Sequence, residues 1–234
     1  MMVKVIQFLN NVLDRLLTVF LVLVLLIGIW FLYDTLYVFY GASPGRVAPY
    51  RPDAEEDSSE VRPFTEDYAA WLSMKGTDIE YPVMQAENNL KYLNTDPYGD
   101  YSLSGAIFLD CRNNRDFSDS YSLLYGHHMS GNLMFGALDN FYDETYFDSH
   151  RTGTLAVGDQ VYHLESFALL SEDAREEVFF EPQGSLAVLE AAESSAIYYR
   201  TPKNEHILAL STCVDAASTM RTILLLSMEP EIDS

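Results

Sequence analysis

The amino-acid sequence predicts a mainly β domain with peripheral helices, preceded by an N-terminal transmembrane helix. Two observations support this fold class. A long uncharged apolar run lies near the N-terminus, and beyond it short runs rich in β-branched and aromatic residues alternate with turn residues. That spacing is typical of a mainly antiparallel barrel or sandwich. The chain has 234 residues, 48% of them hydrophobic, which is enough for one membrane segment and one folded domain.

The apolar run at 16–33 carries no charged side chain, and together with residues 35–40 beyond Asp34 it is long enough to cross a bilayer. Residues 1–40 are therefore predicted to form a cytoplasmic N-terminus and a transmembrane signal anchor. Lys4 and Arg15 precede the run, and the next basic residue after it is Arg46. The positive-inside rule therefore predicts a single-pass protein of the cell membrane, with a cytoplasmic N-terminus and an extracellular domain. A cleaved signal peptide is the rival interpretation, but the run is too long and no small-residue cleavage site follows it closely.

Segment 41–62 is predicted to be an acidic, proline-rich linker that holds the domain away from the membrane. Prolines and the acidic cluster at 53–57 both keep a chain extended. An ordered arm packed on the domain is the alternative. The folded domain is expected to span 63–234.

Within this domain, short apolar runs bounded by turn residues are predicted to be strands. They are 79–84, 106–109, 121–125, 154–157, 161–170, 206–210 and 222–228. A short helix is predicted at 65–72, with Thr65 at its N-cap. Two further helices are predicted at 133–142 and 185–199, where apolar residues recur three and four apart.

The formal net charge is −21, and nearly all of it lies after residue 40. A surface this acidic cannot neutralise a row of phosphates, so nucleic acid is excluded as a partner. The same charge opposes flat binding to anionic lipid. We attribute the excess of acidic residues to solubility.

The two cysteines, Cys111 and Cys213, lie in different sequence contexts. In an exported protein they could form a disulfide, but Cys111 is interpreted as a small, half-buried side chain at a strand end. A zinc site is not expected, because no further His or Cys stands at ligand spacing from the histidine pair at 127–128.

The apolar run 207–213 places Cys213 at the end of a predicted strand, and Arg221 opens the next apolar run. A thiol attacks acyl carbon as the thiolate, which needs a base or a positive neighbourhood. Arginine is always protonated and can hydrogen-bond a developing oxyanion. His127 and His128 follow another strand and offer the base. Alone, each residue also fits a structural or surface role, but together they predict a Cys-His-Arg acyl-transfer enzyme.

The joint pattern of Tyr-Gly-His-His-Met at 125–129, Leu-Ser-Thr-Cys at 210–213 and Arg221 resembles the sortases, and class B most of all. Those are membrane-anchored cysteine transpeptidases of Gram-positive bacteria. The resemblance runs from about 64 to 228, and the helix-containing insertion at about 175–199 favours class B over class A. It implies an eight-stranded β-barrel with a substrate groove at its strand ends. Supporting matches lie at 81–83, 89–93, 105–110 and 132–135.

The resemblance also implies residue roles. Cys213 would be the nucleophile, His127 the general acid and base, and Arg221 the group that steadies the substrate and the oxyanion. The positions that would bind substrate are Asn89, Tyr125, Ser211 and Thr212. The roles implied for these residues need no metal ion and no organic cofactor.

The implied reaction is cleavage of a Pro-X-Thr-type sorting motif after threonine, followed by acyl transfer to a cell-wall or pilin amine. The implied partners are surface proteins bearing a C-terminal sorting signal, and peptidoglycan or a pilin as acceptor. Two alternatives stay open: an inactive sortase-like surface binding module, and a pilin-polymerising sortase of another class. A papain-like peptidase is disfavoured, because there the cysteine precedes the histidine and starts a helix.

Overall fold

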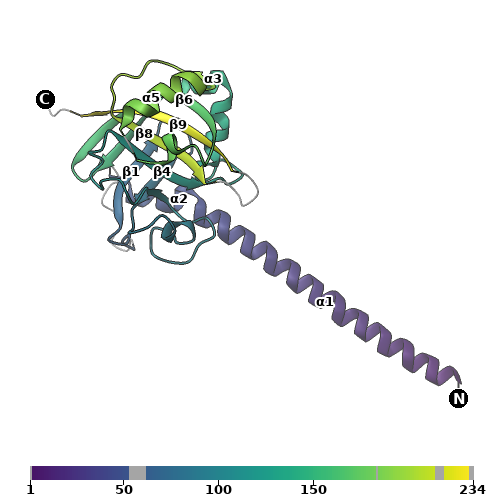
Figure 1. The fold of residues 1–234 in the computed structure, drawn as a ribbon. Coiled ribbons are helices and arrows are strands. Elements are labelled where there is room, and N and C mark those ends of the chain that lie inside the picture. The colour runs from purple at the N-terminus through teal and green to yellow at the C-terminus, as the bar shows by residue number, and fades with distance from the viewer. Residues whose placement is uncertain (1, 53–61, 183, 214–218, 232–234) are drawn as a thin grey trace. The chain divides into compact units, whose positions relative to one another are not determined.

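The computed structural model describes residues 2–52, 62–182, 184–213 and 219–231. The chain divides into two compact units, Met1–Tyr40 and Gly41–Ser234. The first unit lies within helix α1 (Met2–Ala42; Figure 1). The large apolar side chains of this helix are exposed. With a mean hydropathy of 2.8 over its most apolar window, α1 is long and apolar enough to be a candidate membrane span.

The second unit is built on one nine-stranded sheet among the described residues. Its strands are β1 (Tyr68–Met74), β2 (Glu80–Met84), β3 (Ile107–Leu109), β4 (Tyr121–His127), β5 (Thr152–Val157), β6 (Gln160–Asp173), β7 (Tyr198–Tyr199), β8 (Ile207–Cys213) and β9 (Met220–Pro230). The strand order is β5-β1-β2-β3-β4-β8-β9-β6-β7, and β5 also pairs with β6. Eight strands therefore close into a barrel, with β7 added on the outside of β6, which confirms the predicted fold class.

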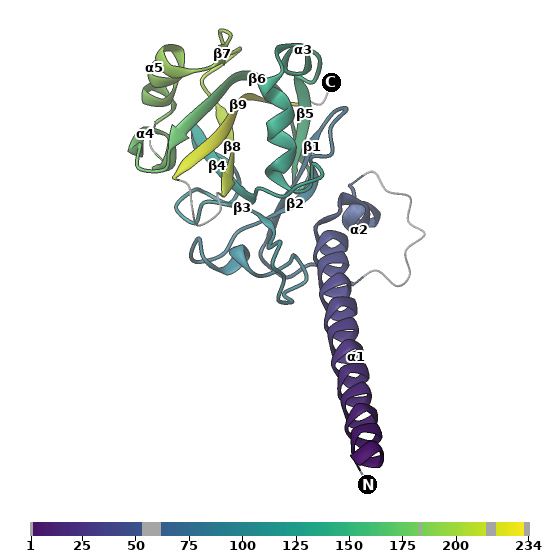
Figure 2. The same ribbon diagram turned by 90° about the vertical axis from the view of Figure 1, so that its right-hand side faces the viewer.

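Short helices lie between and around the strands (Figure 2). They are α2 (Pro44–Val47), η1 (Ala48–Tyr50), η2 (Lys91–Leu93), η3 (Phe135–Tyr142), α3 (Glu144–Ser149), α4 (Glu177–Phe180) and α5 (Ser185–Ser195). The helix predicted at 185–199 is confirmed as α5, although the last residues of that range form β7. The helix predicted at 133–142 is a 3-10 helix, η3.

The helix predicted at 65–72 is wrong, because most of that range belongs to strand β1. β1 pairs with β2 on one side and with β5 on the other. Trp71 and Leu72 are buried between these neighbours. Pairing on both sides outweighs the weak local preference for helix that suggested a capped turn at Thr65.

Two strand pairs differ from the expected antiparallel arrangement. β2 pairs with β3, and β4 with β8, in parallel. A parallel pair needs a long crossover, and residues 128–206 supply one between β4 and β8. The strands that carry the predicted histidine and cysteine therefore both end at the same edge of the sheet.

Strands β4, β8 and β9 are apolar on both faces. One set of alternate side chains, including Leu124, Leu210 and Leu224, belongs to the core inside the barrel. The other set packs outside the barrel in a second cluster with residues of α4 and α5. Strands covered on both faces have little freedom to shift, so their ends are fixed in position.

Residues 41–52 of the predicted linker, which we call the arm, are ordered on the domain. Ala42 and Val47 are buried, and the arm's Arg46 forms an ion pair of 3.0 Å with Asp96. Buried apolar side chains explain why this part packs instead of extending, as in the alternative of an ordered arm. The acidic cluster of the predicted linker, at 53–57, lies outside the described residues.

Candidate active site

The three predicted catalytic residues come from β4, β8 and β9, which are adjacent strands of the barrel (Figure 2). The parallel register of β4 and β8 ends with His127 beside Cys213. On the other side of β8, the Thr222 backbone N–H donates to Thr212 Oγ1 at 3.1 Å. The antiparallel register of β8 and β9 ends with Ser211 opposite Ile223, and two further residues along it position 221 would lie opposite position 213. The Cys213 side chain and the loop 214–218 lie outside the described part of the structure.

His127 is half-buried at the end of β4. Burial lowers the pKa of its imidazole below the ordinary histidine value, because desolvation disfavours the charged ring. Its Nδ1 atom is buried and has no hydrogen-bond partner among the described residues. A neutral imidazole at neutral pH can accept a proton from a neighbouring thiol.

Arg221, at the start of β9, is also half-buried. Among the described residues, the buried Nη1 atom of Arg221 has no hydrogen-bond partner, and the guanidinium group forms no ion pair with a carboxylate. Leaving a guanidinium N–H unpaired costs free energy, which a bound anionic group would recover. Arg221 can therefore stabilise negative charge that develops during a reaction.

The packing around position 126 explains why a glycine precedes His127. Its position points into the barrel, where an added Cβ would lie 2.4 Å from Ile107 Cδ1 and 2.7 Å from Phe135 Cδ2. Both neighbours are buried side chains of the core. The absence of a side chain at 126 lets Phe135 pack directly against the strand that holds His127.

We expect Gly126→Ala to destabilise the domain by ~1–3 kcal/mol, because the methyl group overpacks a filled core. Gly184→Ala is the matched control, since a Cβ at Gly184 meets nothing within 4 Å. Thermal unfolding followed by circular dichroism measures both. A lower melting temperature for Gly126→Ala alone supports the packing role; equal shifts in both variants would contradict it.

Of the four predicted substrate-binding residues, only Tyr125 is both partly exposed and located on a strand that carries a predicted catalytic residue, namely β4. Its hydroxyl donates to Asp110 Oδ2 at 3.1 Å. Ser211 and Thr212 are buried, with 0% and 2% exposure, so their side chains offer a substrate no surface. Asn89 uses both ends of its amide internally: Nδ2 donates to Asp110 Oδ2 at 2.9 Å, and Oδ1 accepts from the Cys111 backbone N–H at 2.8 Å.

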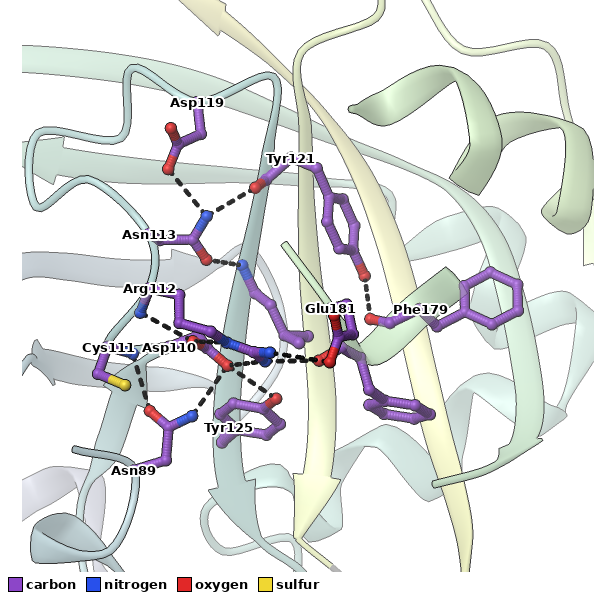
Figure 3. A network of polar contacts seen from close by, with 12 residues as sticks. Asn89, Asp110, Cys111, Arg112, Asn113, Asp119, Tyr121, Tyr125, Phe179 and Glu181 are labelled. Atoms are coloured by element: carbon purple, nitrogen blue, oxygen red, sulfur yellow. Dashed lines mark hydrogen bonds and ion pairs between the residues drawn. The ribbon is translucent and has the colours of Figure 1, made fainter. Parts of the chain in front are cut away.

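Sequence reasoning missed a polar network centred on Asp110 (Figure 3). This carboxylate is fully buried, and the Arg112 side chain donates to both of its oxygens, at 2.9 and 2.8 Å. Burial acts to raise the pKa of Asp110, but the hydrogen bonds from Arg112 hold it below the ordinary value. Arg112 Nη2 also donates to the Phe180 carbonyl at 2.7 Å. The network therefore connects Tyr125 to α4. In the sequence, the only indication of this network is an aspartate, Asp110, directly after the predicted strand 106–109.

His128, unlike His127, has a side-chain partner among the described residues. Its Nε2 lies 2.7 Å from Asp139 Oδ2 on η3, at the exposed surface. This pair attaches the residue after His127 to η3 and gives His128 a structural partner.

Cys111 is a free, half-buried thiol just after β3, as predicted. The Asp110 backbone N–H donates to the Leu123 carbonyl, which sets this end of β3 beside Leu123. His127 lies four residues farther along β4, roughly 13 Å at the usual strand rise. Because Cys213 is level with His127, Cys111 is too far from it for the Cα separation of a disulfide.

Among the described residues, no group of three or more His, Cys, Asp or Glu side chains is arranged to hold a metal ion.

No protein-family model matches the chain. It is 27% identical over 168 residues to sortase B of Listeria monocytogenes, covering 69% of this chain and 68% of that protein. The chain spans about two thirds of the length of the curated relatives it matches.

Solved structures are also similar. One is a class B sortase of Streptococcus pyogenes involved in pilus biogenesis, with 38% identity and a TM-score of 0.64 over 71% of this chain and 94% of that one. Another is sortase B from the type II pilus of Streptococcus pneumoniae, with 32% identity and a TM-score of 0.58 over 69% and 92%.

Proposed function

We propose the reaction of this chain from its family, because it belongs to the class B sortases, which are cysteine transpeptidases. The chain cleaves a Pro-X-Thr-type sorting motif after threonine and transfers the acyl group to an amine. The observation that carries the proposal is the strand register, which pairs position 127 on β4 with position 213 on β8, while Arg221 belongs to the start of the neighbouring strand β9.

In the first half of the reaction, His127 accepts the proton of the Cys213 thiol, and the thiolate attacks the threonyl carbonyl carbon. The carbonyl electron pair becomes an oxyanion that Arg221 stabilises by hydrogen bonding. When the intermediate collapses, the C–N bond breaks and the imidazolium of His127 protonates the departing amine. A thioester on Cys213 remains.

In the second half, an acceptor amine attacks the thioester carbon and loses a proton to His127. The C–S bond breaks, and the proton returns to the thiolate. Water in place of the amine would give hydrolysis, so transfer requires an acceptor held close to the thioester. Tyr125 is the residue we propose to line the groove that holds the substrate, because it is half-exposed two residues before His127.

For the acceptor, we propose a pilin amine ahead of peptidoglycan. The support is that two relatives with 38% and 32% identity are pilus sortases. The donor would be a surface protein with a C-terminal sorting signal. We further propose that α1 anchors the enzyme in the cell membrane with its N-terminus in the cytoplasm, on the strength of its apolar length and of Lys4 and Arg15.

The test is incubation of the full chain, in detergent micelles, with a panel of Pro-X-Thr peptides and hydroxylamine, followed by intact-mass analysis. A thioacyl adduct on Cys213, or a peptide hydroxamate ending at threonine, supports the proposal and names the motif. If no peptide gives an adduct or a cleavage product, the inactive binding module becomes the better interpretation. Pilin peptides and wall peptides, offered as competing amines, distinguish the two acceptors.

Arg221→Lys should lower kcat/KM by ~100-fold, although the positive charge is kept. An ammonium is a point charge and lacks the planar fork with which a guanidinium holds an oxyanion and substrate together. Steady-state kinetics with the motif found above measure the change. Arg200→Lys, on the far side of β6 in a pair with Asp148, is the control and should change kcat/KM little. Equal losses in both variants would remove Arg221 from the mechanism.

A further inference from the structure

One buried hydroxyl group joins three segments that are distant in sequence. Tyr81 lies in β2 and is 4% exposed. Its hydroxyl donates to the Ala42 carbonyl at 3.1 Å and accepts from the Met134 backbone N–H at 2.9 Å. Ala42 is the last residue of α1 and belongs to the arm, whereas Met134 ends the loop that follows His127.

The loop at 128–134 has a backbone that needs external support. Met134 has a φ of +53° and Asn132 a φ of +59°, in the positive-φ region that residues other than glycine rarely adopt. An isolated antiparallel bridge between His128 and Met134 closes the loop directly after the catalytic strand. The hydrogen bond from the Met134 N–H to Tyr81 holds the far side of that bridge.

The arm is attached independently of the loop. Arg46 forms its ion pair with the buried Asp96 and also lies over the ring of Tyr98, 4.7 Å from its centroid. Val47 is buried beside it, and with Tyr81 and Met134 it lines one small pocket. The arm, Tyr81 and the loop therefore pack as a continuous chain of contacts.

We propose that Tyr81 is a positioning residue through which the arm, which begins at the last two residues of α1, sets the conformation of loop 128–134 and hence the placement of His127. Burial raises the pKa of the Tyr81 phenol, so the hydroxyl stays neutral and can donate and accept at the same time. Without the hydroxyl, both the Ala42 carbonyl and the Met134 N–H lose this partner in a buried place. The positioning role rests on the proposed function only for its effect on turnover.

The first test is Tyr81→Phe in the full chain in detergent micelles. It keeps the ring and removes only the hydroxyl. We expect hydrogen exchange at the Met134 amide to become ~10-fold faster or more, and kcat to fall by ~10-fold with little change in KM. Tyr121→Phe is the matched control: that hydroxyl is also buried, but it donates to the Phe179 carbonyl at 2.7 Å, beside α4. It should leave exchange at Met134 unchanged.

The second test loosens the arm at a distance from the loop. Arg46→Met removes the ion pair and should also speed exchange at Met134, by a smaller factor than Tyr81→Phe. Arg200→Met is its control, because Arg200 likewise combines an ion pair, with Asp148, and a ring contact, 4.2 Å above Phe147. It should leave the Met134 amide as protected as in the unmodified chain.

Two results would overturn the proposal. One is Met134 exchange that is the same in Tyr81→Phe and Tyr121→Phe. The other is faster exchange with an unchanged kcat, which would mean that the loop moves without affecting His127. If the unmodified chain has no transpeptidase activity, the proposed function fails, but the titration of the His127 ring by NMR still decides the positioning role. It should shift in Tyr81→Phe and not in Tyr121→Phe.

Discussion

Cys213→Ala is expected to lower turnover by ~10⁴-fold or more while the domain stays folded. The substitution removes the atom that forms the thioester in the proposed mechanism, and no neighbouring group in that mechanism can replace a nucleophilic sulfur. Intact mass after incubation with substrate peptide should show no adduct, whereas the unmodified chain accumulates one when hydroxylamine is left out. The circular dichroism spectrum and the melting temperature should remain close to those of the parent protein.

Cys111→Ala is the control for this experiment. Cys111 is a free thiol, and its side chain has no place in the mechanism. We expect full adduct formation and turnover from Cys111→Ala. An adduct that survives in Cys213→Ala but disappears in Cys111→Ala would assign the nucleophile to the other cysteine and refute the proposed site.

His127→Ala is expected to lower kcat/KM by ~10²–10⁴-fold, the usual contribution of a positioned general acid and base. The thiol would lose its proton acceptor, and the departing amine its proton donor. The measurement is steady-state cleavage of the best peptide, together with the rate of adduct formation in single turnover. Because His127 serves both half-reactions, acyl-enzyme formation and its resolution should both become slow.

His128→Ala is the matched variant, since it changes the adjacent histidine. It breaks the exposed pair with Asp139 and leaves the end of β4 in place. An exposed ion pair contributes little, so we expect a loss of less than ~10-fold. If the two alanine variants were equally impaired, or if His128→Ala were worse, the base would have to be reassigned.

The same histidine predicts a pH dependence. Burial lowers the pKa of His127, so the neutral, proton-accepting ring persists to more acidic pH than it would in an exposed histidine. The acid limb of the kcat/KM profile should therefore lie below the ordinary histidine pKa of ~6.5. A limb above that value would show that another group controls protonation.

Much of the fold was predictable because its signals are local. Apolar runs bounded by turn residues identified the cores of β2, β3, β4, β5, β6, β8 and β9, and the uncharged stretch at 16–33 identified α1. The joint order of Tyr-Gly-His and Leu-Ser-Thr-Cys predicted that a histidine and a cysteine end two strands, and β4 and β8 do end at His127 and Cys213.

What only the tertiary structure decided depends on partners far away in the chain. Local preference suggested a helix at 65–72, but pairing with β2 and β5 makes it a strand. Ser211 belongs to the motif that carries the nucleophile, yet its own side chain is buried. The sequence resemblance suggests that Asn89 binds substrate, but both ends of its side-chain amide form hydrogen bonds to Asp110 and Cys111. The sequence gives the identity and order of the reactive side chains. Burial and hydrogen bonding depend on non-local packing, and they determine which of these side chains remain accessible to a substrate.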